Sequence, residues 1–226
     1  MKAFVVDLDS NKNQIMLKPS TRPFSNQAHQ VNEAAEKIHE LIKNAPYSND
    51  NIVLNRNEIK EAFFSPFKPQ LKTVQVFLSH SHADRNKALK VKDYLENQTK
   101  RKVFIDSLFW DYKDDVLNEL AEYDDISRIK DAFTLILRES LQDMIEKCPY
   151  FVFLQSNNSV PNQGLSRITY SAWIYEELKI AHSISAISES RSIPMMESMQ
   201  VFHDISPFLE SLKTITLSEL SRMINS

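Results

Sequence analysis

Residues 74–84 read VQVFLSHSHAD, an apolar run that ends in a cluster of serine, histidine and aspartate. The β-branched and aromatic residues of Val74–Ser79 predict a buried strand, because a strand covered on both faces has no polar side. Apolar residues at helical spacing follow over 85–98, and a second strand is predicted at Val103–Asp106. The chain therefore enters a strand–helix–strand pattern at this point.

The alternation continues to the C-terminus. We predict helices over 112–122, 126–146 and about 169–187, a strand at Tyr150–Leu154, short strands at Ile193–Met196 and Met199–Phe202, and helical pieces at Pro207–Leu212 and Leu217–Ile224. Strands separated by helices predict an α/β fold with a parallel sheet covered on both faces. Ligands of such sheets bind at the carboxyl ends of the strands, which are the loops after Ser79, Asp106 and Ser156.

Residues 1–71 have a different pattern. Ala3–Leu8 has the composition of a short strand, apolar spacing predicts a helix over 27–44, and a short helix ends near Phe64. The sequence Ser65-Pro66-Phe67-Lys68-Pro69 then breaks regular structure. We therefore predict a small α-rich N-terminal extension of residues 1–71 and an α/β domain of residues 72–226.

Composition excludes several classes of site. Gly164 is the only glycine, so loops that cradle phosphate with several glycines are absent. The net charge of −3 gives no basic excess for nucleic acid. No apolar stretch approaches the roughly 20 residues that span a bilayer, and the N-terminus does not read as a secretory signal. We expect a cytoplasmic protein that binds neither nucleic acid nor membranes.

Three segments, in this order, resemble a TIR domain (Toll/interleukin-1 receptor type). They are Val76–Asp84 (VFLSHSHAD), Val103–Asp106 (VFID) and Ser171–Leu178 (SAWIYEEL), the last similar to the S-x-W-x-x-x-E-L helix of that family. The resemblance implies a flavodoxin-like fold for residues 72–226. Many TIR domains cleave the nicotinamide–ribose bond of NAD, and bacterial ones serve in antiviral defence. The resemblance therefore implies an enzyme that forms ADP-ribose or a cyclic ADP-ribose signal, with NAD as substrate and no cofactor.

The catalytic glutamate of TIR enzymes lies four residues after the tryptophan, which is the position of Glu177. Trp173 and Glu177 share a helix face at this spacing, whereas Glu176 is rotated by about 100°. A carboxylate close to the ribose can stabilise the oxocarbenium-like species that forms when nicotinamide leaves. The resemblance implies a substrate site made of Ser79, His80, Ser81, Asp106, Phe109, Trp110 and Trp173.

Residues 106–112, DSLFWDY, lie where the family has its BB loop, which contributes to substrate access and to self-association. Three interpretations of the aromatic residues Phe109 and Trp110 are therefore open: they form a pocket lid, an interface, or part of the core. The loop lacks the R-D-x-x-P-G sequence of animal receptor adaptors. We expect chains to associate through the TIR domain.

Three alternatives stay open. His80-Ser81-His82-Ala83-Asp84 resembles the zinc motif H-x-H-x-D-H of metallo-β-lactamase-fold hydrolases, but Arg85 stands where that motif needs histidine, and we expect no bound metal. A TIR-like scaffold without catalysis is the second alternative. The third is a nucleotide-processing enzyme similar to nucleoside deoxyribosyltransferases, which share the fold and use a glutamate nucleophile.

Overall fold

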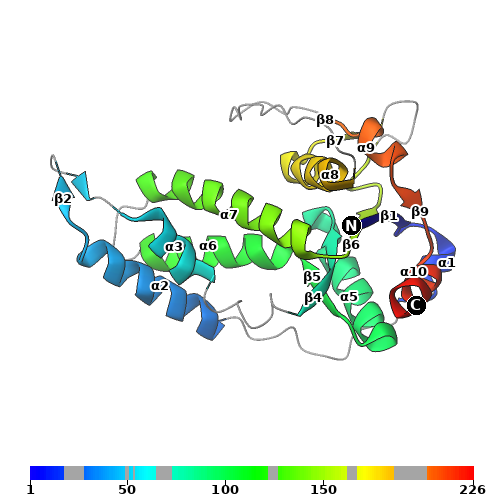
Figure 1. The fold of residues 1–226 in the computed structure, drawn as a ribbon, viewed down its shortest axis with the longest axis horizontal. Helices are drawn as coiled ribbons and strands as arrows, with labels where there is room; N and C mark the ends of the chain where they lie inside the picture. Colours follow the sequence, from blue (N-terminus) through cyan, green and yellow to red (C-terminus); the bar gives the residue numbers. More distant parts are fainter. Residues whose placement is uncertain are drawn as a thin grey trace. The chain divides into compact units, whose positions relative to one another are not determined.

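The computed structural model describes residues 1–17, 28–48, 51–52, 54–64, 73–121, 127–161, 167–185 and 203–226 (Figure 1). The strands are β1 (Lys2–Asp7), β2 (Tyr47–Ser48), β3 (Asn51–Ile52), β4 (Val74–Ser79), β5 (Lys102–Ile105), β6 (Tyr150–Gln155), β7 (Ile168–Thr169), β8 (His203–Asp204) and β9 (Lys213–Thr214). The helices are α1 (Asn11–Gln14), α2 (Ala28–Lys43), α3 (Arg56–Phe64), the 3-10 turn η2 (His82–Asp84), α5 (Arg85–Thr99), α6 (Ser107–Ala121), α7 (Ser127–Lys147), α8 (Ala172–Ser185), α9 (Ser206–Glu210) and α10 (Leu217–Asn225).

The central sheet has five parallel strands in the order β5-β4-β6-β1-β9, and helices flank it (Figure 1). Strand β4 lies between β5 and β6, with Phe77 opposite Phe104 on one side and Phe151 on the other. The prediction that these three strands are parallel neighbours is therefore confirmed. The order β5-β4-β6 corresponds to the 2-1-3 start of the flavodoxin-like order 2-1-3-4-5, and the predicted α/β fold class is confirmed.

The N-terminal strand β1 occupies the next place in this sheet. It pairs with β6 along its whole length, from Lys2 opposite Tyr150 to Asp7 opposite Gln155. Its central residues Phe4–Val6 are buried, as expected for a strand with neighbours on both sides. The predicted division after residue 71 therefore does not separate the parts of this structure, because β1 belongs to the sheet of the α/β domain.

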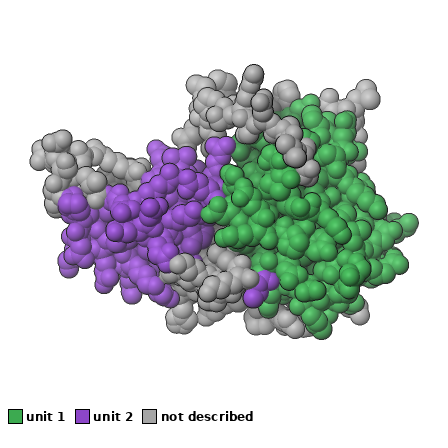
Figure 2. Space-filling model, viewed as in Figure 1, with its two compact units in different colours: residues 1–20, 74–107, 141–226 green, residues 21–73, 108–140 purple. Residues whose placement is uncertain are grey.

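Two compact units make up the chain (Figure 2). Unit 1, residues 1–20, 74–107 and 141–226, contains the five-stranded sheet. Unit 2, residues 21–73 and 108–140, has Phe63 in its core. The Tyr112 hydroxyl donates to the backbone oxygen of Phe63 at 3.0 Å, and the Phe63 ring packs edge-on against Tyr112 and Phe133. This core joins segments that the sequence analysis placed in two different domains.

Helix α6 differs most from the sequence prediction. It begins at Ser107, so residues 107–112 are helical and the predicted loop over 106–112 is wrong. The carboxylate of Asp106 accepts a hydrogen bond from the backbone N–H of Ser107 at 2.8 Å. The N–H groups in the first turn of a helix have no partner within the helix, so this bond stabilises the start of α6. The apolar residues Leu108-Phe109-Trp110 are consecutive and do not show the i, i+3, i+4 spacing of a helix. The sequence pattern therefore did not indicate that the helix begins at Ser107.

Two further expectations concern the short strands predicted between residues 193 and 202 and the absence of membrane-spanning segments. The strands predicted at Ile193–Met196 and Met199–Phe202 lie outside the described residues. Within the described part of the chain, no helix has the length and apolar character needed to cross a membrane.

Candidate functional site

Buried polar side chains gather at the carboxyl ends of β4 and β5. Ser79 is the last residue of β4 and is followed by His80, and Asp106 directly follows β5. Adjacent parallel strands end at the same edge of a sheet, which brings these residues together. Nδ1 of His80 lies 2.6 Å from Oδ1 of Asp106, and the two side chains are 0% and 6% exposed.

Glu177 completes this group from helix α8. The buried face of α8 consists of Ile174, Glu177, Leu178 and Ala181, which is helical i, i+3, i+4, i+7 spacing. Helical geometry therefore carries the Glu177 carboxylate into the interior, where it is 0% exposed. The neighbouring Glu176 is half-buried, with its carboxylate 4.0 Å from Nζ of Lys179. The two glutamates thus have different surroundings, and Glu177 does not lie on a solvent-exposed face of the helix.

Burial is the largest influence that raises the pKa of Glu177, and the negative charge of Asp106 raises it further. The Ser79 hydroxyl acts in the opposite direction and lowers that pKa. Even so, both oxygens of Glu177, Oγ of Ser79 and both ring nitrogens of His80 have no well-aligned hydrogen bond within the described residues. A buried polar atom without a partner costs free energy, so a cluster of five is typical of a site built for chemistry.

The other expected site residues differ in their burial and in the unit to which they belong. Ser81 and Trp173 are half-buried, and Trp173 shares α8 with Glu177. Phe109 and Trp110 lie in the first turns of α6 and belong to unit 2, and their side chains lie outside the described part of the structure. Among the described side chains, the structure therefore brings together Ser79, His80, Asp106 and Glu177.

A second polar cluster, which the sequence analysis missed, lies at the ends of β1, β4 and β6. The buried carboxylate of Asp84 accepts the Ser156 hydroxyl and, at 2.9 Å, the side-chain amide of Asn158. Nζ of Lys87 lies 3.6 Å from Asp84 and donates to Asp9 at 2.9 Å. Sequence separations of 72 and 78 residues explain why no local pattern indicated these contacts.

This second cluster controls the charge of Asp9. Burial by itself raises the pKa of Asp9, but the hydrogen bond and charge of Lys87 and the backbone N–H of Asn157 outweigh it and lower the pKa. The cluster is internally satisfied, in contrast to the group around Glu177. We therefore assign it a structural task, which is to hold η2 and the segment after β6 against each other.

We expect Asp84→Asn to lower the free energy of unfolding by about 1 kcal/mol, because a neutral amide makes weaker hydrogen bonds and is not attracted to Lys87. Urea unfolding measures the change. The double variant with Ser156→Ala should cost less than the sum of the single variants, since the two side chains share one bond. Strictly additive costs would contradict the structural role of this bond.

The zinc alternative finds little support in the geometry. His80 is buried against Asp106, whereas His82 is exposed and Asp84 is bonded to Ser156. His182 contacts Ser211 at 3.0 Å and His203 stacks on Tyr175, so the candidate further ligands have other neighbours. No group of three His, Cys, Asp or Glu with metal-binding geometry occurs among the described residues. The absence of bound zinc stays a prediction.

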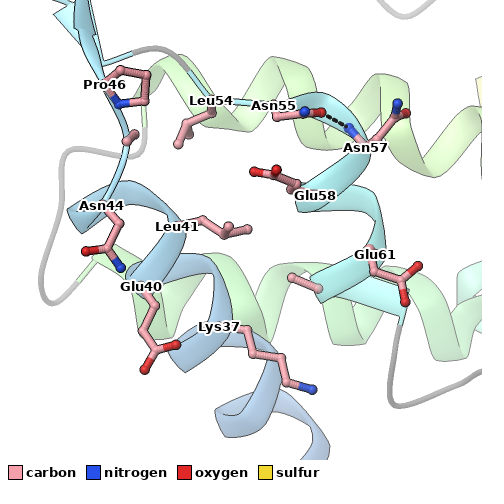
Figure 3. A pocket seen from close by; sticks show the side chains of 12 residues that line it. Lys37, Glu40, Leu41, Asn44, Pro46, Leu54, Asn55, Asn57, Glu58 and Glu61 are labelled. Atoms are coloured by element: carbon pink, nitrogen blue, oxygen red, sulfur yellow. Dashed lines mark hydrogen bonds between the residues drawn. The ribbon is translucent and has the colours of Figure 1, made fainter.

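Unit 2 contains a groove of about 1010 Å³ between α2 and α3 (Figure 3). Leu41, Leu54 and Glu58 point into it, and the Asn55 side chain binds the backbone N–H of Asn57 at 2.9 Å beside it (Figure 3). The described residues that line the groove include no histidine, cysteine or aspartate. Its glutamates Glu40, Glu58 and Glu61 are exposed, so the groove lacks the buried carboxylates that distinguish the group around Glu177.

Comparison of the chain with protein-family models, with curated proteins and with solved structures finds no match. The chemistry of the site must therefore be argued from the residues that form it.

Proposed function

We propose that this chain is a TIR-type enzyme that cleaves the nicotinamide–ribose bond of NAD, with Glu177 as the catalytic group. The observation that carries the proposal is the Glu177 carboxylate, fully buried beside Asp106 and Ser79 at the strand ends and without a well-aligned hydrogen bond. The products would be ADP-ribose or its cyclic form, in the cytoplasm, and a role in antiviral defence agrees with the resemblance of VFLSHSHAD, VFID and SAWIYEEL to TIR segments.

The chemistry suits a buried carboxylate. Nicotinamide leaves with the electron pair of the glycosidic bond, and positive charge develops on the ribose at C1′. A carboxylate in a dry environment stabilises such charge far better than it would in water. The nicotinamide ring of NAD is itself a cation, so its binding favours the ionised form of Glu177 and offsets the burial that raises its pKa. The substrate would thus create the charge that the reaction needs.

The burial of Glu177 also sets a requirement. A substrate reaches this carboxylate only when the site opens, because Glu177, His80 and Asp106 are all buried. We propose that self-association of the chains stabilises the open form, in keeping with the expected association of the chains through the TIR domain. Contacts between TIR domains can be heterologous and can extend into filaments.

The decisive experiment incubates the purified chain with NAD and follows nicotinamide release, with and without a crowding agent that promotes association. Release supports the proposal. A chain that binds partners but never releases nicotinamide under either condition would instead be a scaffold. Transfer of deoxyribose between nucleobases, with no action on NAD, would support the nucleoside deoxyribosyltransferase alternative, which also uses a carboxylate next to an anomeric carbon.

We expect Trp110→Ala to weaken clustering of the chains and to lower NAD cleavage by about tenfold in dilute solution, since a large aromatic side chain is a common anchor of protein contacts. Light scattering and nicotinamide release measure the two effects. Crowding should restore part of the activity. A variant that clusters and reacts like the wild type would remove Trp110 from the association surface.

A further inference from the structure

His80 has a geometry that the resemblance does not account for. Its side chain is 0% exposed and its Nδ1 lies 2.6 Å from Oδ1 of Asp106. Neither ring nitrogen has a well-aligned hydrogen bond within the described residues. Beside an ionised Asp106, two lone pairs would repel at 2.6 Å, which favours a proton on Nδ1. In the neutral ring with this tautomer, Nε2 has the free lone pair.

The free nitrogen belongs to the same group of residues as Glu177. Asp106 contacts His80 and also raises the pKa of Glu177, while Ser79, the neighbour of His80 in the chain, lowers it. The charged and titratable side chains placed in this group are Asp106 after β5, Glu177 on α8 and His80 itself. His82, two residues further on, is exposed in η2 and lies outside the group.

We propose that His80 is the general base for the second half of the reaction, in which water attacks C1′ of the ribose. This inference rests on the proposed NAD cleavage. In the first half the C1′–N bond breaks, its electron pair goes to the nicotinamide nitrogen, and neutral nicotinamide leaves. In the second half the water oxygen bonds to C1′ while its proton passes to Nε2 of His80 and then to solvent. The sum is NAD plus water giving nicotinamide, ADP-ribose and one proton.

Each half of the reaction then depends on a different residue. Glu177 opposes the positive charge that both halves share, whereas His80 is needed only when the attacking group must lose a proton. A pyridine base that attacks C1′ has no proton to lose, so exchange of nicotinamide for labelled nicotinamide in NAD requires Glu177 but not His80. Asp106 is a positioning residue in this scheme, because it acts through the ring of His80.

The test compares hydrolysis and base exchange in the full chain, with His82→Gln as the matched control. We expect His80→Gln to lower hydrolysis by roughly a hundredfold, a usual contribution of general base catalysis, and to leave exchange of labelled nicotinamide within about threefold of wild type. Exchange that survives also shows that the variant is folded.

Three other outcomes would overturn the role proposed for His80. Equal losses of hydrolysis and exchange in His80→Gln would make His80 a structural residue and overturn the inference, while the proposed function stands. Unchanged hydrolysis in His80→Gln would overturn it in the same way. A wild-type chain that neither hydrolyses NAD nor exchanges nicotinamide would overturn the proposed function, and the role of His80 would fall with it.

Discussion

Glu177→Gln is expected to lower NAD cleavage by about a hundredfold or more, while Glu176→Gln leaves it near the wild-type rate. Glutamine keeps the size of the side chain and removes its negative charge. The charge opposes a developing cation in a buried site, where such an interaction is worth several kcal/mol, and each 1.36 kcal/mol is a factor of ten in rate. Nicotinamide release, measured at saturating NAD, gives the comparison.

The two glutamates form a matched pair for this experiment. They are adjacent on α8, but Glu177 is 0% exposed and lies near Asp106, whereas Glu176 is half-buried and near Lys179. A change that acted through the helix as a whole would affect both variants alike. Comparable activity in wild type and Glu177→Gln would reject Glu177 as the catalytic group, and equal losses in both variants would indicate a general structural effect.

The loss should extend to base exchange, because both halves of the reaction pass through the same cationic ribose. In this respect Glu177→Gln differs from His80→Gln, for which only hydrolysis is expected to fall. The pair of variants therefore separates charge stabilisation from proton transfer with the same two assays.

Periodicity predicted the elements that build the site. The apolar runs at Val74–Ser79 and Tyr150–Leu154 are strands of one parallel sheet, and the helix that carries Glu177 begins at Ala172. These are local patterns, since a buried strand or an amphipathic helix shows its period within a dozen residues. The i, i+4 relation of Trp173 and Glu177 is equally local.

Pairing over long sequence distances could not be read in the same way. β1 lies next to β6, almost 150 residues later, and an apolar hexapeptide carries no information about which strand it will join. The contact between His80 and Asp106 depends on the order β5-β4 in the sheet, which the alternation of strands and helices leaves open. The division of the chain into units follows from such contacts, which is why a boundary drawn at the proline-rich segment 65–69 failed to separate them.

Glu177→Gln should also make the protein more stable at neutral pH, by about 1–3 kcal/mol, even as it removes activity. Folding at neutral pH must either bury this charge without a well-aligned hydrogen bond and beside the negative Asp106, or protonate a carboxyl that is ionised in the unfolded chain. Removing a buried charge that lacks compensation relieves that cost. An amide of the same shape has no net charge to bury, and it can donate a hydrogen bond to Asp106.

The sign of the pH dependence follows from the raised pKa of Glu177. The native state binds this proton more tightly than the unfolded state, whose pKa is close to the ordinary value of 4.5. Stability from the protonated carboxyl is therefore fully present below that value, and it is lost as pH rises from 4.5 through the raised native pKa. Glutamine has no such transition, so the stability difference between variant and wild type should grow over this window and then level off.

Urea unfolding of wild type, Glu177→Gln and Glu176→Gln at a series of pH values measures this difference directly. Subtracting the wild-type curve from each variant's curve cancels the groups that titrate alike in both proteins. We expect a rising difference for Glu177→Gln, with Glu176→Gln as the matched control on the same helix. A Glu177→Gln protein that is less stable than wild type at neutral pH would mean that the buried carboxylate is compensated in the native state, and the cost assigned to burying it would be wrong.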